Sequence, residues 1–106
     1  MSITERYRQI LERIDRESDH LYEILPEETA NALRWVDIVA EELQDWVDLV
    51  GEIPQFQLEA KLSPVLLKAH GDLDRARVFL ENSDHQEAGE LVWELEQELY
   101  RLLNDL

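Results

Sequence analysis

The sequence predicts an all-α protein, and more specifically an antiparallel four-helix up-down bundle. Three observations lead to this fold class. Apolar residues recur at the helical period through most of the chain. Only three glycines and three prolines interrupt the 106 residues, and no Asn-Gly or Asp-Gly pair marks a β-hairpin. Four helices of similar length joined by short connections are expected to pack antiparallel in a single domain, residues 1–106.

The first helix is expected over residues 3–25 and the second over residues 27–50. Pro26 should end the first, because proline disfavours helical geometry in the residue before it. Gly51 is predicted to take the left-handed conformation that often follows a helix, with Pro54 soon after. The first helix carries a single apolar stripe: Ile3, Tyr7, Ile10, Ile14, Leu21 and Ile24.

The third helix, over residues 55–82, contains Pro64 and Gly71, which both disfavour helices. It is therefore predicted to be kinked or broken near these residues, and a broken helix would favour an extended helical array. Its apolar stripe keeps its phase through both residues, which favours one kinked helix. The fourth helix is expected over residues 84–105, with Ser83 and Gln86 spaced as a capping box.

The composition narrows the class of protein. The chain is 44% hydrophobic, enough for a core, and it has no cysteine, which excludes disulfides, thiolate metal sites and cysteine nucleophiles. The first residues carry charges where a secretory signal needs an apolar run. No apolar stretch approaches the roughly 20 residues of a membrane span. We expect a soluble, cytoplasmic protein.

The net charge of −15 comes from 25 acids against 10 bases. Such a field opposes direct binding to nucleic acid or to an anionic membrane surface. The imbalance is uneven: residues 1–16 hold four arginines against three acids, whereas residues 27–59 hold nine acids and one base. Residues 81–106 hold eight acids and one base. The acids therefore belong mainly to the second and fourth helices.

The second helix has more apolar surface than a bundle seam requires. One apolar row suffices for the core, but a second row lies beside it, and together they exceed the roughly 100° stripe of a surface helix. On the fourth helix, two aromatic residues lie off the leucine stripe. Both sets predict contacts with another protein chain, most simply in a symmetric dimer. The second helix could instead lie centrally with neighbours on two sides, and the rings of the fourth helix could instead cover the bundle flank. The predicted contact residues are Trp35, Val39, Trp46, Leu49, Trp93 and Tyr100.

The remaining arc of the second helix is acidic. Five acids recur there every three or four residues, which slightly destabilises a helix by like-charge repulsion. This acidic ridge is either a solvated outer face or a surface that docks onto a basic protein. Its residues are Asp37, Glu41, Asp45, Asp48 and Glu52.

Two histidines come close to known patterns without completing them. Glu17 and His20 form the Glu-x-x-His pair of di-iron bundles, but the second such pair is missing. His70 raises the possibility of a phosphotransfer bundle, yet Gly71 follows it at once and Leu73 stands where those domains have lysine. We expect neither a metal site nor phosphotransfer.

The segment EELQD, with Glu41, Glu42 and Asp45, resembles half of the carboxylate motif of all-α nucleotide pyrophosphohydrolases. The resemblance implies a metal-dependent nucleotide hydrolase that binds magnesium through these carboxylates. It covers five residues, Asp45 stands where the family has glutamate, and the later ExxD motif is absent. We therefore expect no enzyme, no catalytic residue and no cofactor.

The first functional hypothesis is a small acidic, non-enzymatic protein-interaction module, an adaptor or regulator that forms a homodimer. The alternative is an acidic inhibitor or nucleic-acid mimic, such as an immunity protein or phage-type blocker, that docks on a basic target. A third interpretation attributes the acids, and eight arginines against two lysines, to a salt-rich or GC-rich source organism.

Overall fold

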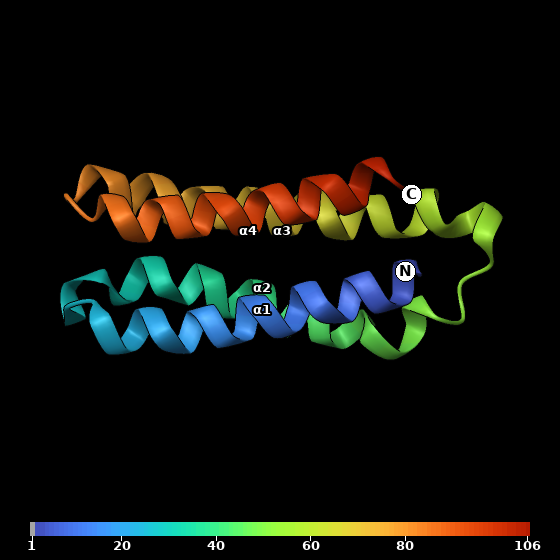
Figure 1. Ribbon diagram of the computed structural model, residues 1–106, viewed down its shortest axis with the longest axis horizontal. Helices are drawn as coiled ribbons and strands as arrows, with labels where there is room; N and C mark the ends of the chain where they lie inside the picture. Colours follow the sequence, from blue (N-terminus) through green and yellow to red (C-terminus); the bar gives the residue numbers. More distant parts are fainter. Residues whose placement is uncertain (1) are drawn as a thin grey trace.

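The computed structural model describes residues 2–106 and shows four α-helices in that range. They are α1 (Ile3–Ile24), α2 (Ala30–Val50), α3 (Leu58–Asn82) and α4 (Gln86–Asn104). Figure 1 shows that successive helices run antiparallel, with the α1–α2 pair beside the α3–α4 pair. The bundle extends 43 × 21 × 20 Å. The predicted fold class is confirmed, and the predicted helix bounds agree to within three residues.

Two short 3-10 turns precede α2 and α3. They are η1 (Glu27–Thr29) and η2 (Gln55–Gln57), and they account for the later start of both α-helices. The prediction for Gly51 is wrong, because its φ of −69° is right-handed. The end of α2 instead tightens, with the Glu52 amide donating to the Leu49 carbonyl at 2.9 Å. Pro54 then stops any continuation of the helix.

The helix α3 is unbroken through both Pro64 and Gly71. Pro64 removes one backbone hydrogen bond, which would have reached the carbonyl of Ala60. Pro64 and Ala60 are both exposed, so water can donate a hydrogen bond to the Ala60 carbonyl. Gly71 is also exposed and touches nothing across the bundle. The interruptions therefore lie on the outer face, while the opposite face supplies the core: Leu58, Leu62, Leu66, Ala69, Leu73, Ala76 and Leu80.

The turn between α3 and α4 does not contain the predicted capping box. The helix α3 extends to Asn82, so Ser83 caps its C-terminus and cannot begin α4. Asp84 takes the left-handed conformation with a φ of 66°. The His85 amide donates to the Leu80 carbonyl at 2.8 Å, completing a Schellman motif. The Gln86 amide group donates backwards, to the Glu81 carbonyl at 2.9 Å.

The core is built mainly from leucine, isoleucine and valine of all four helices. Its one fully buried aromatic side chain in the described part of the chain is Tyr7, whose hydroxyl donates to the backbone carbonyl of Leu43. This bond fixes α1 against α2. Within residues 2–106, no helix combines the length and the apolar character that crossing a membrane requires.

Candidate interaction surfaces

The predicted contact residues of α2 differ in how far they are exposed to solvent. Val39 is fully buried, so its assignment to a surface between chains is wrong. The reason is that α2 packs against both α1 and α3, and two neighbours use more of the apolar arc than one would. Leu49, near the end of α2, remains 47% exposed.

Trp35 and Trp46 are partly buried against the core. The guanidinium of Arg75 on α3 lies 5.0 Å from the centroid of the Trp35 ring, a cation–π contact. Trp46 lines a shallow groove with Val65 and Lys68 of α3. Both rings therefore cover the α2–α3 flank, and α2 has neighbours on two sides, the alternative that the sequence left open for this helix.

Trp93 and Tyr100 are the aromatic residues that α4 presents outward, each 50% exposed. They are seven residues apart, or two helical turns, so they share one face with Gln97 between them. We call Trp93, Gln97 and Tyr100 the α4 aromatic face. On its α3 side, the Tyr100 ring lies 6.2 Å from that of His70. On its α1 side, Trp93 and Gln97 line a recess with Arg13.

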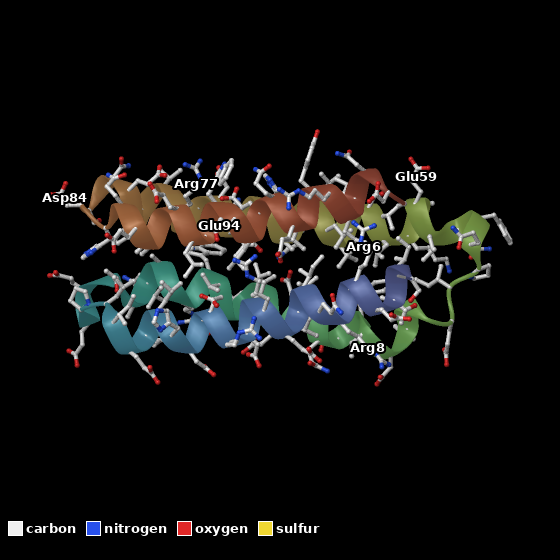
Figure 2. All side chains as sticks on the ribbon, viewed as in Figure 1. Arg6, Arg8, Glu59, Arg77, Asp84 and Glu94 are labelled. Atoms are coloured by element: carbon white, nitrogen blue, oxygen red, sulfur yellow. The ribbon has the colours of Figure 1, made fainter. Side chains whose placement is uncertain are left out.

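A polar cluster around the buried side chain of Glu96 joins α3 to α4 beside this face. The carboxyl group of Glu96 is almost fully buried and accepts a hydrogen bond from Arg77 Nε at 3.2 Å. Arg77 also binds Asp74 at 2.6 Å and Glu81 at 2.8 Å. His70 Nε2 lies 3.8 Å from the second oxygen of Glu96. Figure 2 shows Arg77 on the α3–α4 side of the bundle.

Within this cluster the pKa of Glu96 is raised and the pKa of Asp74 is lowered. Burial, and then the hydrogen bond and charge of Asp74, raise the pKa of Glu96 from 4.5 to about 8, although Arg77 opposes this shift. The hydrogen bond from Arg77 lowers the pKa of Asp74. At neutral pH, Glu96 therefore keeps its proton while Asp74 is ionised. This cluster was not predicted from the sequence, where only the pairs of Arg77 with Asp74 and Glu81, at i,i+3 and i,i+4 spacing, leave a local signal.

A second buried acid, Asp72, links α3 to α2. Its carboxylate lies 3.0 Å from Lys68 Nζ and 3.0 Å from Arg75. Lys68 also binds Glu42 of α2. In the EELQD segment, Glu42 thus points to α3 and Glu41 lines a groove toward α1, while Asp45 lies between them and borders the grooves on both sides. The three carboxylates do not converge, and within residues 2–106 no cluster of three or more His, Asp or Glu side chains is placed to hold a metal ion.

Only part of the acidic ridge is free to bind another molecule, because one of its acids is hydrogen-bonded within the bundle. Asp37 accepts hydrogen bonds from the hydroxyls of Ser18 at 2.7 Å and Tyr22 at 2.6 Å, so it ties α2 to α1. Burial and the contact with Asp37 raise the pKa of Tyr22 to about 12. The other four acids of the ridge, Glu41, Asp45, Asp48 and Glu52, are exposed.

Comparison with protein-family models, curated proteins and solved structures gave no match.

Proposed function

We propose that this protein is a small acidic interaction module that self-associates through the α4 aromatic face. The observation that carries the proposal is the exposure of Trp93 and Tyr100, each half accessible to solvent, on one face of α4. The other two tryptophans are partly buried by α3 and the core. Large aromatic residues on one exposed face are typical of the anchors of protein interfaces.

The face is suited to a second copy of itself. If two α4 helices pack antiparallel about a two-fold axis at Gln97, side chains on the same flank of the face and at similar distances from Gln97 meet across the axis. Trp93 of one copy then lies close to Tyr100 of the other, because both rings project from the same flank. An aromatic pair of this kind contributes about 0.5–1.5 kcal/mol beyond the area that it buries.

Charge gives this proposal a distinctive salt dependence. Each copy has a net charge of −15, so the two repel each other except at the contact. Salt shortens the range of this repulsion to about 8 Å at physiological ionic strength. Self-association should therefore strengthen as salt is added, the opposite of what docking of an acidic surface on a basic one would show.

The test compares the mass of three proteins by sedimentation equilibrium. The native chain should form a dimer at micromolar to high micromolar concentration, and Trp93→Asp should be monomeric. Phe56→Asp is the matched control, because Phe56 is 84% exposed but lies in η2, away from α4. A native chain that stays monomeric, or a Trp93→Asp variant that dimerises as the native chain does, would contradict the proposal.

The acidic ridge supports a second candidate, docking onto a basic protein. Asp15 of α1 joins Asp37, Glu41 and Asp45 along a groove of about 350 Å³ between α1 and α2. Such a surface suits a partner rich in lysine and arginine. Reversal of Glu41, Asp45 and Asp48 to lysine should abolish capture of a basic target and leave the dimer mass unchanged. Retained capture would rule out the ridge as the binding surface.

A further inference from the structure

The groove between α1 and α4 is lined by four of the ten basic residues of a strongly acidic chain. It has a volume of about 600 Å³. Ligand pockets are typically about 300–1,000 Å³. The arginines are Arg6, Arg13 and Arg16 of α1 and Arg101 of α4. We call this the arginine groove.

Two of these arginines hold the helices together. Arg6 binds Asp105 at 2.7 Å, and Arg13 binds Glu94 at 3.0 Å and also Glu98. Figure 2 shows Arg6 directed from α1 toward α4, in the space between the two helices. The α1–α4 pair is the least closely packed of the neighbouring pairs of α-helices. Ion pairs thus bridge a gap that apolar side chains do not close.

The other two arginines are not used in this way. Arg16 has a contact of only 3.9 Å, with its neighbour Glu17, and its side chain is 68% exposed. Arg101 is exposed and has no ion pair within 4.0 Å among residues 2–106. A purely structural role explains Arg6 and Arg13 but gives no reason for two further guanidinium groups at the same groove.

The lining defines the kind of ligand. Arg6 and Arg13 are neutralised by the acids that they bind, so Arg16 and Arg101 are the two lining guanidinium groups that remain for a ligand. The methylene stems of the arginines add an apolar surface over the buried side chain of Ile10. Guanidinium groups bind carboxylate and phosphate oxygens in bidentate pairs. A long polyanion would be repelled by the charge of −15 elsewhere on the chain, so the ligand must be small.

We infer that the arginine groove is a binding site for a small organic dianion with an apolar body, a phosphate monoester or a dicarboxylate. Arg16 and Arg101 bind the anionic group, and the methylene stems of the lining arginines contact the apolar body. Arg101 borders the α4 aromatic face, whereas Arg16 lies on α1, so Arg16→Gln separates the two proposals: it should weaken dianion binding and leave the dimer mass unchanged.

The test is a ¹H–¹⁵N NMR titration of the native chain at constant ionic strength. The probes are phenyl phosphate, phthalate and the uncharged benzyl alcohol. At least one dianion should bind saturably and shift signals of residues 6–16 and 98–101, and the tighter one identifies the anionic group. Failure of both dianions to saturate, or equal binding of benzyl alcohol, would overturn the inference.

Two single substitutions test whether the dianion binds in the arginine groove. Arg16→Gln and Arg101→Gln remove guanidinium groups that hold no structural ion pair, so both variants should fold as the native chain does. Each should weaken dianion binding about tenfold or more, as expected for loss of a charge-assisted hydrogen bond. Arg8→Gln is the matched control, since Arg8 is exposed on α1 and does not line the groove. A loss as large in Arg8→Gln as in Arg101→Gln would show a general charge effect and contradict the site.

Discussion

The buried carboxyl group of Glu96 should make the bundle less stable as the pH rises. Its pKa is about 8 in the folded protein against 4.5 for an ordinary glutamate. Between these values the folded chain holds one more proton than the unfolded chain, so its stability is greatest at low pH and is lost toward pH 8. One extra proton corresponds to a loss of roughly 1 kcal/mol per pH unit. From pH 6 to pH 8 the free energy of unfolding should fall by about 2 kcal/mol through this group.

The substitution Glu96→Gln should remove this loss. Glutamine resembles the protonated acid, so it can donate to Asp74 and accept from Arg77 at every pH. The variant should match the native chain near pH 6 and be about 2 kcal/mol more stable at pH 8, or roughly 10 °C higher in Tm for a domain of this size.

The assay is urea denaturation of both proteins at intervals from pH 5 to pH 9. His70, Asp74 and Arg77 also face Glu96 and are present in both proteins, so the difference between the two curves reports the titration of Glu96 together with its coupling to these three groups. Glu90→Gln, an exposed position on the same helix, is the control for loss of one charge. Parallel pH profiles for the native chain and Glu96→Gln would refute the reasoning.

Three further predictions concern stability. Asp84→Gly should stabilise the chain by about 1 kcal/mol in urea denaturation, because Asp84 has a φ of 66° and glycine tolerates that conformation; a destabilised variant would contradict this. Tyr7→Phe should lower the free energy of unfolding by about 1 kcal/mol through loss of the hydrogen bond to the Leu43 carbonyl, and an unchanged urea midpoint would argue against that bond. Raising NaCl from 0.05 to 0.5 M should increase the Tm of monomeric Trp93→Asp, because salt screens the repulsion among its acids. A Tm that falls would indicate that ion pairs such as Arg13–Glu98 outweigh the repulsion.

The helices and their order could be predicted because one apolar stripe per helix must face a common core. The same logic did not identify the ends of the helices. Gly51 had the position of a left-handed cap, but the chain tightens there into a right-handed turn. Ser83 and Gln86 had the spacing of a capping box, but α3 continues far enough to use Ser83 as its own C-cap. Local signals of this kind are weak where a neighbouring helix competes for the same residue.

The candidate surfaces could be predicted only in part, because a helical plot gives the width of an apolar arc and not the number of neighbours that cover it. Val39 and Trp35 lie in the same predicted row, yet one is in the core and the other lies under Arg75 of α3. Trp93 and Tyr100 stay half exposed because they lie off the leucine stripe of α4, where Tyr100 meets only the edge of α3 and Trp93 only the edge of α1. The contact between Arg77 and Glu96 depends on the register of α3 against α4, which no local pattern specifies.

Self-association through α4 can be tested most directly by introducing one cysteine at Gln97, since the native chain has none. At a two-fold axis the two copies of residue 97 face each other, so mild oxidation of Gln97→Cys should give a disulfide-linked dimer in high yield. Glu41→Cys, on the acidic ridge, is the exposed control and should remain largely monomeric. Equal crosslinking of the two variants, or none in either, would contradict the central claim that the α4 aromatic face joins two copies of this chain.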